Sequence, residues 1–223
     1  CAAPWRTGQT GCQARRNTGP RSAQARPQQV RPEQIRSAQM SLRIIAGQWR
    51  GRKLTVPAGE VTRPTADRTR ETLFSMLVSR LGDFEGLAVA DLFAGSGALG
   101  LEALSRGAAS CVFVEQDPAA IRALRGNVAA LQAQSQCDVR AGSVLALGPA
   151  KAPLDLVMLD PPYGTGAGEV ALDKLQRLGW IGEATWVSLE TAFNEVPKIK
   201  GLEAVADRKV GKARITLLRV LPA

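Results

Sequence analysis

The sequence predicts an α/β fold, with a doubly wound and mostly parallel β-sheet between layers of helices. Short apolar runs alternate with segments whose apolar residues recur at helical spacing, a pattern typical of strand–helix–strand units. In the first unit, the apolar run 87–90 leads into a glycine-rich turn at 95–100, and a helix then ends at Gly107. The runs 202–206 and 213–218 have no helix between them, which predicts an antiparallel hairpin that closes a sheet of seven strands.

The middle of the chain repeats the same unit. Its patterns predict strands at 111–114, 136–140, 154–159 and 186–189, and helices at 118–131 and 170–178. Asp117 and Pro118 suit the N-cap and the first position of the helix that they open. Because the carboxyl ends of parallel strands share one edge of a sheet, we expect ligands to bind at that edge.

Two further elements are expected before the first strand of the sheet. The β-prone runs 42–46 and 52–56 flank a glycine-rich turn, which predicts a β-hairpin. A helix is then expected from Thr65, as its N-cap, to about Gly82. We therefore expect three parts: a tail at 1–39, an N-terminal hairpin and helix at 40–82, and the sheet domain at 83–223.

Composition narrows the class of protein. The chain has 223 residues, of which 45% are hydrophobic, enough for one substantial core. No run approaches the roughly 18 apolar residues that a membrane span needs, so we expect a soluble, cytoplasmic protein that binds no membrane. The absence of histidine excludes His-based triads and His metal ligands. Because the four cysteines show no CxxC spacing, neither a disulfide framework nor a metal site is expected.

The positive charge lies near the N-terminus. Of the net charge of +9, residues 1–40 carry +6, residues 41–72 carry +4, and residues 73–223 carry −1. A basic arm on a near-neutral body is typical of a polyanion-binding extension. Residues 1–39 have few hydrophobic side chains, so we expect a disordered tail, and Met40 opens a segment that resembles a natural start.

The glycine turn predicts a cofactor site. Gly95 and Gly97 let the backbone approach a ligand closely, and the helix that follows points free N–H groups at it. Asp91, where the strand ends, is a poor neighbour for a pyrophosphate but a good one for S-adenosylmethionine, which carries an ammonium and a sulfonium. Glu115 ends the next strand and suits ribose hydroxyls. The expected cofactor contacts are Asp91, Phe93, Ala94, Gly95, Ser96, Gly97, Glu115, Gln116, Ser143 and Val144.

A second motif, Asp160-Pro161-Pro162-Tyr163, directly follows the strand at 154–159. The prolines lack N–H donors, so the loop presents only acceptors beside an aromatic ring. Such a loop can accept both hydrogens of a planar exocyclic amine while Tyr163 stacks on the base. We expect these four residues to form the catalytic loop of an amino-methyltransferase; the alternative is an ordinary strand-to-helix turn.

The predicted hairpin gathers cations around one aromatic side chain. Arg43, Arg50, Arg52 and Lys53 lie on it, with Trp49 in the turn. Cations beside an aromatic ring suit phosphate contact and base stacking, although a solvated hairpin with Trp49 packed on the body fits equally well. The expected RNA contacts are Arg43, Trp49, Arg50, Arg52, Lys53, Arg63, Thr65 and Arg68.

Several motifs together resemble one family. They are Leu42-Arg43-Ile44-Ile45-Ala46-Gly47, Arg50-Gly51-Arg52-Lys53-Leu54, Arg63-Pro64-Thr65-x-Asp67-Arg68-x-Arg70-Glu71-x-Leu73-Phe74, Asp91-Leu92-Phe93-Ala94-Gly95-Ser96-Gly97 and Asp160-Pro161-Pro162-Tyr163. In this order and spacing they resemble the RsmD family, bacterial 16S rRNA guanine-N2 methyltransferases. Two departures are Tyr163, where many relatives have Phe, and the stretch 142–144, which lacks the acid that often binds the adenine amine.

The resemblance implies a class I S-adenosylmethionine-dependent methyltransferase fold and a guanine in 16S rRNA, or in an assembling 30S subunit, as substrate. It also implies S-adenosylmethionine as the cofactor. We further expect residues 83–223 to be the catalytic domain and the protein to be a monomer. The enzymatic alternatives are methylation of DNA, at adenine N6 or cytosine N4, and of a protein glutamine. A non-catalytic RNA-binding protein on the same fold is the alternative from another class.

Overall fold

The computed structural model describes residues 42–57 and 64–221. The predicted tail at 1–39 and Arg63 lie outside these residues. Among the described residues, no helix has the length and apolar character needed to cross a membrane.

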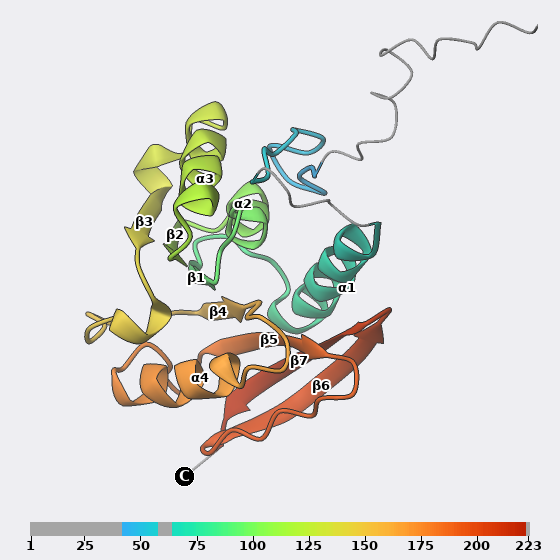
Figure 1. The fold of residues 1–223 in the computed structure, drawn as a ribbon, viewed down its shortest axis with the longest axis vertical. Coiled ribbons are helices and arrows are strands. Elements are labelled where there is room, and N and C mark those ends of the chain that lie inside the picture. The colour runs from blue at the N-terminus through green and yellow to red at the C-terminus, as the bar shows by residue number, and fades with distance from the viewer. Residues whose placement is uncertain (1–41, 58–63, 222–223) are drawn as a thin grey trace, which may run out of the picture. The chain divides into compact units, whose positions relative to one another are not determined.

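The seven-stranded sheet has the order β3-β2-β1-β4-β5-β7-β6 (Figure 1). Its strands are β1 (Ala88–Leu92), β2 (Ser110–Glu115), β3 (Cys137–Ala141), β4 (Leu156–Leu159), β5 (Trp186–Ala192), β6 (Leu202–Val210) and β7 (Ala213–Val220). Strands β1 to β5 pair in parallel, whereas β7 runs antiparallel to both β5 and β6. The predicted doubly wound sheet with its antiparallel closing pair is therefore confirmed.

Helices cover both faces of this sheet. They are α1 (Pro64–Leu81), α2 (Ala98–Ser105), α3 (Pro118–Ala130) and α4 (Ala167–Arg177), with short 3₁₀ turns η2 (Gln134–Gln136) and η3 (Val144–Ala146). Asp117 caps α3 as predicted, because its carboxylate accepts hydrogen bonds from the N–H groups of Ala119 and Ala120. Helix α1 begins one residue before Thr65, its predicted N-cap.

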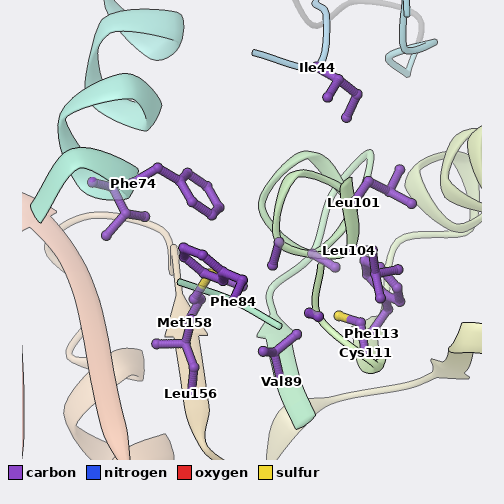
Figure 2. Close-up of a cluster of buried hydrophobic side chains, with 14 of the residues drawn as sticks. Ile44, Phe74, Phe84, Val89, Leu101, Leu104, Cys111, Phe113, Leu156 and Met158 are labelled. Atoms are coloured by element: carbon purple, nitrogen blue, oxygen red, sulfur yellow. The ribbon is translucent and has the colours of Figure 1, made fainter. Parts of the chain in front are cut away.

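Two apolar cores lie against the two faces of the sheet. Helices α1, α2 and α3 supply one core, and α4 supplies the other. The segment 42–57, which we call the N-terminal hairpin, contributes Leu42, Ile44 and Leu54 to the first core. Figure 2 shows Ile44 on one side of α2 and the sheet residue Val89 on the other. Helix α2 is therefore enclosed between the sheet and the hairpin.

The N-terminal hairpin is shorter than its sequence predicts. Its two runs form one antiparallel bridge, between Arg43 and Lys53, instead of two full strands. The neighbouring backbone groups bond to helices: the N–H of Ile45 donates to Glu102 of α2, and the N–H of Thr55 donates to Asn127 of α3. Because these groups are satisfied by helix side chains, the two runs do not pair along their full predicted length.

Gly47 lets the hairpin approach α2 at backbone distance. The residue has a φ of +82°, and a Cβ built on it would lie 1.7 Å from the carbonyl oxygen of Ser105. That carbonyl accepts the N–H of Gln48 at 2.8 Å, so it is fixed in place. The close contact therefore requires glycine at this position.

Gly47→Ala should destabilise the protein much more than Gly51→Ala. Both residues have a positive φ, which costs an alanine about 1–2 kcal/mol, but a Cβ on Gly51 meets nothing within 4 Å. The clash at Gly47 should add about 1–3 kcal/mol to the loss. Urea unfolding of both variants measures the difference, and equal losses would show that the hairpin does not dock on Ser105.

Candidate active site

The turn between β1 and α2 has a backbone that leaves room for a ligand. Phe93 has a φ of +65° and Gly95 a φ of +54°. The left-handed conformation costs a residue with a Cβ about 1–2 kcal/mol, so Phe93 is held there by its surroundings, and the next residue, Ala94, donates its N–H to Val114 of β2. A Cβ built on Gly95 meets no protein atom within 4 Å. The turn therefore faces open space at Gly95.

Asp91 lies beneath this turn, with 1% of its surface exposed. Its Oδ2 accepts the N–H of Gly100, in the first turn of α2, at 2.8 Å. Burial raises the pKa of Asp91 to about 7, with a smaller contribution from Glu115, while the bond from Gly100 lowers it. The carboxylate thus fixes the start of α2, and its predicted contact with the cofactor stays a prediction.

Glu115 joins the glycine turn to the turn after β2. Its Oε2 accepts the N–H of Gly95 at 2.8 Å, and its Oε1 accepts those of Gln116 and Asp117 at 2.7 and 2.8 Å. The side chain is half-buried. These bonds bring together Gly95, Glu115 and Gln116, which the sequence placed in one site.

A groove of about 450 Å³ continues from this position. It is lined by Gln116, Pro118, Ile121, Arg122, Arg125, Ala141 and Gly142, at the ends of β2 and β3 and along α3. The next two residues, Ser143 and Val144, do not line it: the Ser143 hydroxyl accepts the N–H of Leu145, and Val144 is buried. Their predicted contact with the adenosine stays a prediction.

The loop 160–163 follows β4 at the same edge of the sheet. The N–H of Asp160 points to the carbonyl of Leu92 at the end of β1, 3.5 Å away, which places the loop beside the glycine turn. Pro161 is buried, whereas Pro162 and Tyr163 are exposed. The Tyr163 hydroxyl donates a hydrogen bond to the carboxylate of Glu190.

Glu190 is the site residue that sequence reasoning missed. It lies within β5, one residue beyond the predicted end of that strand at Leu189. Leu189 pairs with Leu159 of β4, so Glu190 and Asp160 occupy equivalent positions on neighbouring strands. The rule that singled out Asp91, Glu115 and Asp160 would have found it: an acid at the carboxyl end of a core strand.

The site raises the pKa of its acids. Asp160 reaches solvent, yet desolvation by the surrounding protein, together with the negative charges of Glu190 and then Asp91, raises its pKa to about 8. Burial also raises the pKa of Glu190, although the hydrogen bond from Tyr163 lowers it. Burial and the bond to Glu190 raise the pKa of Tyr163, so its hydroxyl stays protonated.

The cations predicted to contact RNA lie on the surface. Arg43, Arg50, Arg52, Lys53 and Arg68 are exposed. The Arg52 guanidinium donates to the carbonyl of Ala130 at 2.6 Å, at the end of α3. Trp49 is half-buried and packs against the core, as the alternative interpretation of the hairpin expected. The structure places Thr65 in the first turn of α1.

Comparison with known proteins gives consistent matches. The family model "Conserved hypothetical protein 95" matches residues 42–219. Ribosomal RNA small subunit methyltransferase D of Escherichia coli K12 is 42% identical over 164 residues, covering 73% of this chain and 81% of that protein. The protein of the same name from Haemophilus influenzae is 41% identical over 159 residues, covering 70% and 81%. The solved structure of yhhF from Escherichia coli has a TM-score of 0.71 and 37% identity, covering 81% of this chain and 98% of that one.

The match to the family model spans the N-terminal hairpin, the glycine turn and the loop 160–163. The structural likeness extends over the seven-stranded sheet, and it confirms the predicted class I methyltransferase fold. The chain belongs to the RsmD family, to which its relatives named ribosomal RNA small subunit methyltransferase D belong.

Proposed function

We propose that this protein transfers a methyl group from S-adenosylmethionine to the exocyclic N2 amine of a guanine in 16S rRNA during small-subunit assembly. One observation carries the proposal: the acceptor loop with Asp160 lies beside the glycine turn at the end of β1, in a chain of the RsmD family. Its relatives are named for ribosomal RNA, which favours RNA over DNA or a protein glutamine as the methyl acceptor.

The residues around the glycine turn fit S-adenosylmethionine. A Cβ on Gly95 would meet no protein atom within 4 Å, so a ligand can approach the backbone there. Glu115 accepts a hydrogen bond from the same turn. We propose that Phe93, Ala94, Gly95, Ser96 and Gly97 contact the cofactor, that Glu115 and Gln116 contact its ribose, and that Asp91, Ser143 and Val144 complete the site. When bound, the cofactor supplies an electrophilic methyl group on a sulfonium.

The loop 160–163 would prepare the amine for the transfer. An exocyclic amine is a poor nucleophile because its lone pair is delocalised into the ring. Asp160 and the carbonyl of Pro161 can each accept one amine N–H, which favours the pyramidal amine and directs its lone pair at the methyl group. As the N–C bond forms and the S–C bond breaks, the Asp160 carboxylate would take up the amine proton and then release it to water. Pro162 keeps the loop rigid and Tyr163 stacks on the base.

The N-terminal hairpin and α1 are proposed as the RNA-binding surface. We propose Arg43, Arg50, Arg52, Lys53, Arg63 and Arg68 as its cations, and Trp49 and Thr65 as further RNA contacts. Charge supports this assignment, because residues 73–223 carry a net charge of −1 and cannot attract a polyanion alone.

Asp160→Asn should lower turnover about 10²- to 10⁴-fold, because the amide cannot take up the amine proton. Binding of S-adenosylmethionine, measured by calorimetry, should change little. Transfer of labelled methyl groups to 16S rRNA and 30S particles measures the turnover. Asp155→Asn is the matched control, because Asp155 lies just before β4, at its other end, and accepts the N–H of Ala88. Near-normal turnover in the Asp160 variant would remove this residue from the mechanism.

The activity should rise with pH through the pKa of Asp160. Because only the ionised carboxylate can accept the proton, kcat/KM should increase about tenfold per pH unit at low pH and level off above about pH 8. Desolvation by the surrounding protein, and then the negative charges of Glu190 and Asp91, keep the pKa of Asp160 high. A pH profile of methyl transfer tests this. If the residual activity of Asp160→Asn rises with pH in the same way, a group other than Asp160 causes the rise.

Replacing Arg50, Arg52 and Lys53 by glutamine should weaken RNA binding and leave S-adenosylmethionine binding unchanged. Each lost phosphate contact should flatten the log–log dependence of affinity on salt by roughly 0.7–0.9. The comparison belongs in a chain that begins at Met40, because the seven arginines before it also attract RNA. The exposed lysines Lys151, Lys198 and Lys200 provide the control triple variant. Equal salt slopes in the two triple variants would place the RNA surface elsewhere.

A further inference from the structure

We infer that Glu190 is a specificity-determining residue: its free carboxylate oxygen accepts the N1–H of the target guanine while Asp160 accepts the neighbouring N2 amine. The inference rests on the proposed function and adds to it the means by which guanine is distinguished from the other bases that carry an exocyclic amine.

The sheet places these two carboxylates side by side. Leu159 and Leu189 are paired residues on the parallel strands β4 and β5, and Asp160 and Glu190 directly follow them. Both leucines point into the core beneath α4, so the alternation of strand side chains turns the next residues to the opposite face. Asp91 faces that side too, because its carboxylate bonds to α2.

One oxygen of Glu190 is available to a ligand. Oε1 accepts the hydroxyl of Tyr163, which orients the carboxylate. Oε2 accepts no hydrogen bond from any residue in the described part of the chain, and it is not among the buried atoms that lack a partner. Glu190 is half-buried, so this oxygen keeps some contact with solvent. Tyr163 is the ring proposed to stack on the base, so the free oxygen lies at the edge of the site where the base would sit.

Of the three bases that carry an exocyclic amine, only guanine presents two adjacent hydrogen-bond donors to a pair of acceptors. In guanine, the N2 amine stands next to N1–H, so this edge presents only donors. The adenine N6 amine stands next to the unprotonated N1, and the cytosine N4 amine stands next to the unprotonated N3, which are both acceptors. Two carboxylates therefore attract the guanine edge and repel the other two. Two N–H donors would also relieve the repulsion by which Glu190 raises the pKa of Asp160.

A substrate change tests the N1–H. In 2,6-diaminopurine the N2 amine is kept, N1 becomes an acceptor and an amine replaces the oxygen at C6, so the role of Glu190 is measured by comparing the wild type with Glu190→Gln. A 16S rRNA fragment containing the nucleotide that the wild type methylates is made with guanine or with 2,6-diaminopurine at that position, and kcat/KM is measured for both. The wild type should prefer guanine. Glu190→Gln should reduce this preference about 10- to 100-fold, because its amide can donate to the acceptor N1.

Two control variants distinguish recognition of N1–H by Glu190 from an effect of negative charge alone and from an effect of its hydrogen bond to Tyr163. Glu195→Gln removes a nearby negative charge that also acts on Tyr163, and it should leave the preference unchanged. Tyr163→Phe removes the hydrogen bond to Glu190 but keeps its carboxylate, and it should keep most of the preference. If Glu190→Gln leaves the preference unchanged, or if Tyr163→Phe reduces it equally, the inference is wrong. A wild type that methylates no guanine N2 would instead contradict the proposed function. Thermal unfolding verifies that each variant is folded.

Discussion

The buried carboxylate of Glu102 connects the parts of this molecule. It is fully buried in α2 and accepts the N–H groups of Ile45 and Ala46 and the guanidinium of Arg106. Removing one partner of such a buried charge costs about 3–5 kcal/mol. Asn127 makes a second connection, because its amide donates both to the carbonyl of Thr55 in the hairpin and to that of Ser96 in the glycine turn. The hairpin is thereby fixed to the two helices that flank the turn.

Neighbouring strands of the sheet supply the acids of the site. Asp91, Asp160 and Glu190 come from three neighbouring parallel strands, and the register of the sheet turns all three toward the face covered by α1 and α2. Desolvation raises the pKa of each of these acids, and the charges of Glu190 and Asp91 raise that of Asp160 further. The repulsion within such a cluster is unfavourable when no ligand is bound. A ligand that presents cationic groups or N–H donors interacts favourably with it.

The sequence predicted the sheet, its helices and the two motifs because apolar periodicity and glycine or proline turns are local signals. It did not predict the contacts that hold the hairpin, because Glu102 and Asn127 act on residues more than fifty positions away and neither interrupts the apolar pattern of its helix. The hairpin strands are shortened for the same reason. Glu190 was missed because the apolar run of β5 ends at Leu189, although the strand continues to Ala192. The packing of Trp49 against the core is a tertiary contact that the sequence left open.

The identity of the methylated nucleoside tests the central claim most directly. Unmodified 16S rRNA or 30S particles, made in cells that lack the endogenous enzyme, are incubated with this protein and S-adenosylmethionine, digested to nucleosides and analysed by mass spectrometry. The account predicts one new product, N2-methylguanosine, at one position of the RNA. A product methylated on adenine or cytosine, or methylation of DNA in place of RNA, would contradict it.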